Sequence, residues 1–159
     1  MSESPPTALR ALEILEQGNA RFVESLDRPG VLLSGTTPVE LPDEQRPTAI
    51  ILGCSDARVP AEIVFDQGLG DLFVIRVAGN IIAPSLIGSV EFAASEFGTR
   101  LVVVMGHTQC GAVQATIEEI LGPGGPASPN LASIVDRIRP HIEDYVRTSP
   151  HADKAEVWR

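Results

Sequence analysis

Residues 49–54, AIILGC, form a continuous apolar run that ends in a glycine and a cysteine. A strand that is buried on both faces of a parallel sheet has this composition. Two later runs resemble it, LFVIRV at residues 72–77 and LVVVMG at residues 101–106. Helical patterns fill residues 85–97 and 112–121, between and after these two runs. The alternation predicts the α/β class, with a parallel sheet core of three visible strands in the order 2-1-3, flanked by helices.

The segment before this core has a different character. Residues 7–26 place leucine and phenylalanine at helical spacing between glutamates, which predicts an amphipathic helix. Residues 28–47 hold four prolines and two glycines, the composition of a linker. We therefore expect one structural domain, in which residues 1–47 are a helical arm and linker and residues 48–159 are the α/β unit that carries the site.

Helix boundaries are predicted from single residues in the second half of the chain. Gly98 and Gly122 follow the two helices of the core, at the position where a glycine commonly ends a helix. Asn130 is the expected N-cap of a further helix over residues 131–147, which should be kinked or interrupted at Pro140. Residues 149–150, Ser-Pro, suggest the start of one more helix.

The composition is that of a folded domain, with 43% apolar and 21% charged residues. The formal net charge of -9 would repel nucleic-acid phosphates and anionic lipids, so we expect neither a nucleic-acid nor a membrane partner. The apolar runs fall far short of the ~20 residues that span a bilayer. Residues 1–7 do not resemble a secretory signal, so a cytoplasmic location is expected. The only lysine, Lys154, argues against enzymes built on a phosphate-loop or Schiff-base lysine.

Three residues with metal-binding side chains follow the predicted strands. Cys54 ends the first run, and His107 and Cys110 come directly after the third. Ligands of open parallel sheets bind beyond the carboxyl ends of the strands, so these side chains could converge. Two cysteines and one histidine are a zinc-type ligand set with one position left for water, which is the catalytic pattern. The alternative is a pair of buried structural thiols.

Asp56 and Arg58 lie close behind the first cysteine. In an extended chain Cys54, Asp56 and Arg58 would point to one face, which would place a carboxylate and its guanidinium partner beside the metal. A bidentate contact from Arg58 would keep Asp56 ionised and fix its direction. A structural ion pair at the end of a strand is the alternative, and the two interpretations are compatible.

Residues 54–59, CSDARV, and residues 106–111, GHTQCG, together resemble the β-class carbonic anhydrases, and His107 lies 53 positions after Cys54. The resemblance implies zinc ligation by Cys54, His107 and Cys110 and a catalytic dyad of Asp56 and Arg58. It also assigns two positions to the substrate pocket, Gln45 as an amide donor and Phe73 as an aromatic wall, and we expect Val59 to hold the linear substrate together with Phe73. Plain core positions for Phe73 and Val59, and a solvated loop position for Gln45, are the alternatives.

The implied activity is the reversible hydration of carbon dioxide to bicarbonate and a proton, a lyase reaction. Zinc lowers the pKa of bound water from 15.7 towards ~7, and the two thiolates should keep it above that of an all-histidine site. Asp56 would accept the hydrogen bond of the hydroxide and aim it at the carbon. Some members of the family place this aspartate on the metal at low pH, so Asp56 is also a candidate fourth ligand of a closed site.

Two alternatives to this activity remain open. The same site could hydrolyse carbonyl sulfide or carbon disulfide, as related scaffolds do. The chain could also be a zinc-binding homologue without turnover, because family members continue into further strands that would follow Arg159. Without those strands, residues 101–106 are expected at an exposed apolar edge. The amphipathic helix and linker suit an arm laid across a partner, so a homodimer or a dimer of dimers is expected.

Overall fold

The computed structural model describes residues 4–28, 42–123, 125 and 128–148. No helix in these ranges combines the length and the apolar composition that crossing a membrane requires. The elements in chain order are α1 (Ala8–Leu26), β1 (Ala49–Gly53), α2 (Ala61–Val64), β2 (Leu72–Arg76), the 3-10 turn η2 (Ala78–Asn80), α3 (Pro84–Glu96), β3 (Val102–Met105), α4 (Gly111–Leu121) and α5 (Pro129–Thr148).

The three strands form one parallel sheet in the order β2-β1-β3, which confirms the predicted class and strand order. β1 is the central strand, and all of its residues are buried, which explains its unbroken apolar run. In register, Ile51 lies opposite Val74 of β2 and Val103 of β3. The carboxyl ends of the three strands therefore meet at one edge of the sheet.

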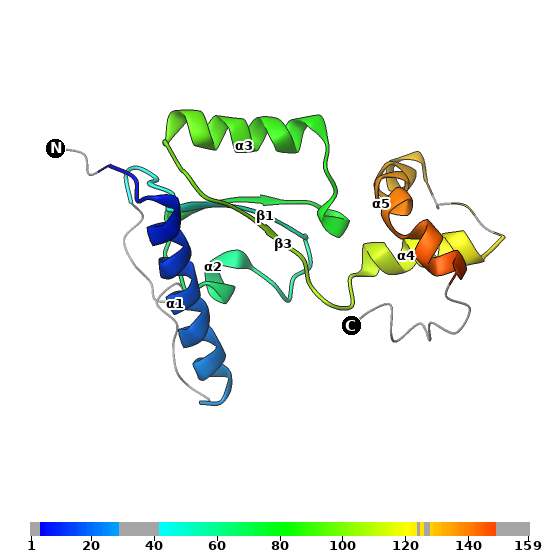
Figure 1. Cartoon of the computed structure of the whole chain (residues 1–159), viewed down its shortest axis with the longest axis horizontal. Helices are drawn as coiled ribbons and strands as arrows, with labels where there is room; N and C mark the ends of the chain where they lie inside the picture. Colours follow the sequence, from blue (N-terminus) through cyan, green and yellow to red (C-terminus); the bar gives the residue numbers. More distant parts are fainter. Residues whose placement is uncertain (1–3, 29–41, 124, 126–127, 149–159) are drawn as a thin grey trace.

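Helices cover both faces of the sheet (Figure 1). On one face α3 packs on a buried cluster made of Ile50, Leu52, Ile75 and Ala93. On the other face α1 and α2 pack on a second cluster made of Leu15, Ala49, Ile51, Ala61 and Leu72. Alternate residues of a strand point to opposite faces, so neighbouring residues of β1 contribute to different clusters.

The amino-terminal helix docks on the end of α2 through a close approach at Gly18. A Cβ atom at Gly18 would lie 1.8 Å from the carbonyl oxygen of Phe65, so only glycine lets the two backbones come this near. The neighbouring Asn19 donates a hydrogen bond to the carbonyl of Val64 (3.0 Å). These two contacts from α1 fix the position of the end of α2.

An ion pair completes this docking: Arg21 of α1 contacts the buried carboxylate of Asp66 at 2.5 Å. The predicted helix over residues 7–26 is confirmed, with Thr7 as its N-cap. Most of the predicted linker, residues 29–41, lies outside the described residues.

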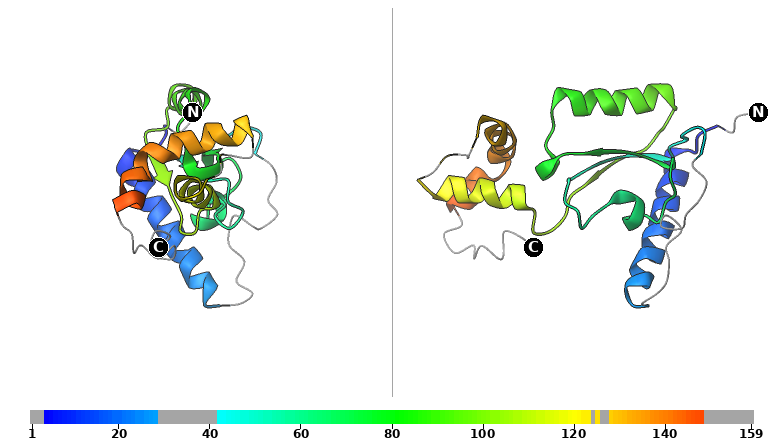
Figure 2. Two further views of the ribbon diagram at one scale, coloured as in Figure 1. Left: turned by 90° about the vertical axis from the view of Figure 1, so that its right-hand side faces the viewer. Right: turned by 180° about the vertical axis from the view of Figure 1, so that it is seen from behind.

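The pair α4 and α5 forms a helical hairpin beyond the carboxyl edge of the sheet (Figure 1, Figure 2). It touches η2 at Gly79, whose φ of 70° lies in the left-handed region. A Cβ atom at Gly79 would come within 2.6 Å of Ile138 and 2.9 Å of Ala112. Glycine therefore allows both the turn and the contact with the hairpin.

The start of α5 differs from the prediction, and Pro140 does not interrupt the helix, whereas a kink there stays a prediction. The helix begins at Pro129, and the hydroxyl of Ser128 accepts a hydrogen bond from the backbone N–H of Leu131 (3.2 Å). Ser128, and not Asn130, is therefore the N-cap, because proline is favourable in the first helical position. The helix also runs through Pro140 as one element. Since Pro140 is exposed, the backbone carbonyl that loses its partner there can bond to water.

The two glycines predicted to end helices behave differently. Gly98 follows α3 with a left-handed φ of 66°, as predicted. Gly122 does end α4, but with an extended backbone (φ -104°, ψ 166°) and a hydrogen bond to the carbonyl of Glu118. The helix predicted to start at residues 149–150 lies outside the described residues.

One edge of the sheet is apolar and exposed in the described part of the chain, as predicted. Among the strands that the structure describes, β3 pairs only with β1, and Val102 and Val104 are 45% and 64% exposed. They lie on the same side of the sheet as α3, but α3 covers β2 and β1 instead. An uncovered strand of this kind is a site for pairing with another strand.

Candidate metal centre

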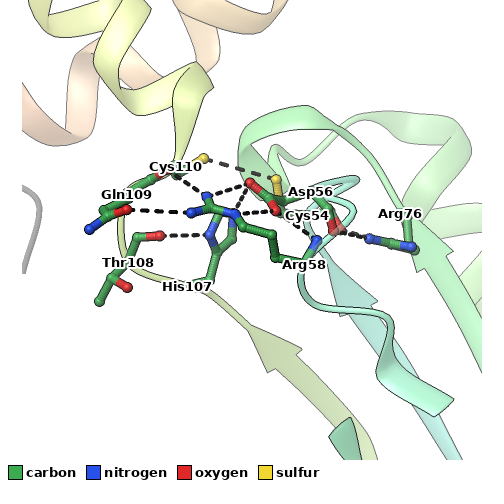
Figure 3. Close-up of polar contacts among 8 residues, drawn as sticks. All are labelled: Cys54, Asp56, Arg58, Arg76, His107, Thr108, Gln109 and Cys110. Atoms are coloured by element: carbon green, nitrogen blue, oxygen red, sulfur yellow. Dashed lines mark hydrogen bonds and ion pairs between the residues drawn. The ribbon is translucent and has the colours of Figure 1, made fainter. Parts of the chain in front are cut away.

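The two cysteines and the histidine singled out in the sequence come together at the carboxyl edge of the sheet (Figure 3). Cys54 follows β1 directly, and His107 and Cys110 lie in the loop between β3 and α4. The ligand atoms of the three residues all lie within 4.8 Å of one another. Adjacent parallel strands thus bring together residues that are far apart in the sequence.

The spacing of the two sulfur atoms fits a tetrahedral zinc ion. With Zn–S bonds of ~2.3 Å, two thiolate ligands should lie about 3.8 Å apart. The Sγ atoms of Cys54 and Cys110 lie 3.9 Å apart. Both cysteines are buried, so the surrounding protein fixes the positions of the two sulfur atoms.

The imidazole of His107 is oriented for the same purpose. Its Nδ1 lies 2.8 Å from the carbonyl of Thr108, and because a carbonyl only accepts, Nδ1 carries the proton. The other nitrogen, Nε2, then keeps its lone pair, and it is buried without a hydrogen-bond partner among the described residues. Histidine ligands of metals commonly donate their second N–H in this way. The residues present therefore fit a zinc ion.

The thiol of Cys54 is prepared to ionise. Burial raises the pKa of the thiol, whereas hydrogen bonds, among them those from the backbone N–H groups of Asp56 and Gly79, lower it by more. The net pKa is about 7, against an ordinary value of 9.0. Much of Cys54 is then thiolate near neutral pH, which is the form that binds a metal.

Asp56 and Arg58 form a bidentate ion pair next to these ligands. The guanidinium donates from Nε to Oδ1 (2.8 Å) and from Nη2 to Oδ2 (2.7 Å). These hydrogen bonds, together with one from the backbone N–H of Arg58, hold the pKa of the Asp56 carboxyl well below its usual range. Oδ2 also lies 3.9 Å from Nε2 of His107. An ionised carboxylate is thereby fixed beside the metal ligands.

The loop does not follow the extended path expected from the sequence. The chain turns at Asp56, whose carbonyl accepts from the N–H of Val59 (3.2 Å) and whose Oδ1 accepts from the N–H of Arg58 (2.9 Å). Aspartate often bonds to the backbone two residues on, which forms such turns. The turn, and not strand alternation, brings the two side chains together.

Two residues of the site were missed by the sequence reasoning. Gln109 accepts from Arg58 through its main-chain carbonyl (3.0 Å) and its side-chain oxygen (3.4 Å), which joins the two ligand loops. Arg76 donates to the main-chain carbonyls of Cys54 and Asp56. Gln109 lies inside the quoted motif GHTQCG, whereas Arg76 carries no local signal, because its partners depend on the pairing of β1 with β2.

The three residues assigned to the substrate pocket differ in their positions relative to the metal ligands. Val59 lies at the turn beside Asp56. Phe73 lies three residues, about 10 Å, before the end of β2, and packs on Phe92 and Phe97 with ring centres 6.2 and 6.0 Å apart. Gln45 lies beside Gly70 at the opposite end of β1. Within this chain Phe73 and Gln45 are not brought to the metal ligands, and their roles stay predictions.

An open cavity of about 510 Å³ adjoins the loop that carries Cys110. It lies between α4 and α5 and beside η2, and its lining includes Ala78, Gly111, Ala115, Ile134 and Val135. The cavity is mostly apolar, with Glu118 and Glu119 among the lining residues. It holds none of the residues predicted to contact substrate.

Comparison with known proteins identifies the family. Residues 49–159 match the family model described as carbonic anhydrase. The chain is 44% identical over 146 residues to a carbonic anhydrase of Mycolicibacterium smegmatis, a match that covers 89% of this chain and 67% of the relative. The chain belongs to the carbonic anhydrase family, in its β class.

Solved structures agree with this fold. The β-carbonic anhydrase CafA of Aspergillus fumigatus is 27% identical, with a TM-score of 0.59, and the match covers 94% of this chain and 65% of CafA. A second match is to a structure described as one of two tetrameric β-carbonic anhydrases from Sordaria macrospora. The two chains are 21% identical with a TM-score of 0.59, and the match covers 90% of this chain and 71% of the other. This chain therefore spans about two thirds of the length of its relatives.

Proposed function

We propose that this chain carries the zinc site of an enzyme that reversibly hydrates carbon dioxide to bicarbonate and a proton. The observation that carries the proposal is the placement of the Asp56 carboxylate. It lies beside a buried Cys-His-Cys ligand set and is fixed by the guanidinium of Arg58. Zinc held by Cys54, His107 and Cys110 would supply hydroxide near neutral pH.

The chain's own residues would orient the reaction. Because Asp56 stays ionised, its Oδ atoms can accept the hydrogen bond of the attacking oxygen and turn a lone pair towards the carbon. Arg58 keeps the Asp56 carboxylate ionised, and it also donates a hydrogen bond to Gln109 in the second ligand loop. Val59, next to this turn, is the proposed apolar contact for a linear substrate.

We further propose that the site is of the open kind, with the fourth position free for water. Both carboxylate oxygens of Asp56 are paired with Arg58. An aspartate that bound the metal would have to give up at least part of this pairing. The names of the matched relatives favour carbon dioxide over its sulfur analogues as the substrate.

Assembly into a homodimer is proposed from the surface of α1. Four of its apolar residues lie along one side of the helix and are 40–76% exposed: Leu9, Leu12, Val23 and Leu26. A helix side of this kind is normally covered. Light scattering on the wild type should give twice the chain mass, and Leu9→Glu with Leu26→Glu should shift it towards one. A wild type that is monomeric at high concentration contradicts this proposal.

The activity is tested by stopped-flow carbon dioxide hydration between about pH 6.5 and 9, on protein whose zinc content has been measured. We expect one zinc per chain and a rate that rises with pH, because hydroxide forms as the pH increases. Cys54→Ser is the control and should lose both zinc and rate. One zinc per chain without a rate above that of buffer would contradict the proposed reaction.

A further inference from the structure

Arg76, the last residue of β2, makes two hydrogen bonds to the loop that carries Cys54 and Asp56 (Figure 3). Its Nε donates to the carbonyl of Cys54 (2.8 Å) and its Nη2 to the carbonyl of Asp56 (2.5 Å). β1 has already ended at Gly53, whose carbonyl accepts from the N–H of Val77 (3.1 Å). The guanidinium therefore continues the pairing of β1 and β2 beyond the point where the strands stop.

The two carbonyls bracket the functional part of the loop. Cys54 supplies a metal ligand, and Asp56 supplies the carboxylate that lies beside the ligands. If either peptide unit rotated, the Cys54 thiolate or the Asp56 carboxylate would be aimed differently. One planar group that binds both carbonyls fixes these two directions at the same time.

The surroundings of Arg76 favour this role over a general surface role. The side chain is exposed, and it forms no ion pair with a carboxylate in the described ranges. In register it lies opposite Gly53, so no side chain on β1 stands between it and the loop. Its partners in the described residues are main-chain carbonyls, which separate N–H groups of a planar guanidinium bind together in a fixed geometry, whereas the donors of an ammonium group all lie on one atom.

We propose that Arg76 is a positioning residue of the metal centre, which holds Cys54 and Asp56 in the geometry that metal binding and catalysis require. The catalytic consequence rests on the proposed function. The consequence for metal affinity does not depend on the reaction: it requires only that Cys54, His107 and Cys110 bind the metal and that the Cys54 thiolate is correctly directed.

The test compares Arg76→Met and Arg76→Lys with the wild type, and Arg100→Met serves as a matched control. Arg100 is also exposed, but it precedes β3 at the opposite end of the sheet. Zinc affinity is measured by competition with a chromophoric chelator, and the visible spectrum is recorded with cobalt(II) in place of zinc. We expect both Arg76 variants to bind zinc about 10-fold more weakly and to show an altered cobalt spectrum, since loss of an outer partner has effects of this size.

Four further outcomes are informative. If Arg76→Lys behaves as the wild type, charge alone is sufficient and the proposed clamp is wrong. If the melting temperature falls while zinc affinity and the cobalt spectrum stay unchanged, Arg76 has only a structural role and the proposal is overturned. If Arg76→Met does not fold, Arg76→Lys decides alone. Restored zinc affinity in Arg76→Met on adding millimolar guanidinium, but not methylammonium, supports the proposal.

A wild type that binds zinc but does not hydrate carbon dioxide would contradict the proposed function. The affinity and spectral results on Arg76 would still stand. Where activity is present, kcat in the Arg76 variants should fall more than KM rises, because a misdirected Asp56 impairs the chemical step and not the capture of substrate.

Discussion

Arg58 donates to both carboxylate oxygens of Asp56, at 2.8 and 2.7 Å, although only one residue separates them in the sequence. The turn at Asp56 makes this geometry possible, because the backbone N–H of Arg58 also bonds to Oδ1 (2.9 Å). The same guanidinium reaches Gln109 in the second ligand loop (3.0 Å). One side chain thus fixes the charge of the carboxylate and connects both halves of the metal centre.

Replacing Arg58 should impair turnover far more than folding. Arg58→Met leaves Asp56 without its bidentate partner, and we expect the rate of carbon dioxide hydration to fall about 10- to 100-fold. Zinc content should stay near one per chain, because the three ligands are unchanged. The measurement is stopped-flow hydration at pH 8 with metal analysis of the same sample. An Arg58→Met protein with full activity would contradict the role given to this pair.

The same variant makes a prediction about stability and pH. The pKa of Asp56 is depressed in the folded state, so its pairing with Arg58 stabilises the fold above the unfolded pKa of about 4 and is lost as the pH falls. Arg58→Met in the metal-free protein should therefore be less stable than the wild type at pH 7, with a difference that shrinks below about pH 4. Urea unfolding at both pH values measures this. A difference that does not depend on pH would rule out the ion pair as its source.

Zinc affinity should depend on pH through Cys54. Its pKa is about 7, so below pH 7 zinc must displace the thiol proton, and this ligand alone weakens affinity about tenfold per pH unit. Above pH 7 the contribution of Cys54 levels off. Chelator competition at pH 6, 7, 8 and 9 gives the profile. A contribution that instead continues to rise up to pH 9 would show that the thiol ionises in its ordinary range.

A pair of glycine substitutions tests the docking of α1. Gly18→Ala should destabilise the fold by about 1–3 kcal/mol or more, because its Cβ would lie 1.8 Å from the Phe65 carbonyl oxygen. Gly88→Ala is the control: it lies in α3 with nothing within 4 Å of the added Cβ, and should stabilise the protein by up to ~1 kcal/mol. Thermal unfolding of both variants measures this. Equal melting temperatures would show that α1 does not depend on this contact.

The fold could be predicted where the residue types of a segment depend directly on whether that segment is buried or exposed. The unbroken apolar run of β1 reflects burial on both faces, and that pattern is local. The convergence of Cys54, His107 and Cys110 also follows, because parallel neighbouring strands end at the same edge. The quoted motifs then supplied the family without any structure.

The features that the sequence reasoning missed depend on choices between competing local signals or on tertiary register. Asn130 and Ser128 are both good helix caps, and the proline between them favours the earlier start. Arg76 acts on carbonyls that become its neighbours only when β2 pairs with β1. No spacing rule in the sequence records such a contact, because its partner is the main chain.

The position of the ligands directly after two adjacent strands also bears on folding. Cys54 and His107 are 53 residues apart, and that interval contains β2, α3 and β3. A metal that joins them closes a long loop. A permanent link of that length would lower the conformational entropy of the unfolded chain, which corresponds to a stabilisation of the fold by roughly 4 kcal/mol. Zinc would thus act as a removable cross-link, and the ion that serves the chemistry would also hold the two halves of the sheet together.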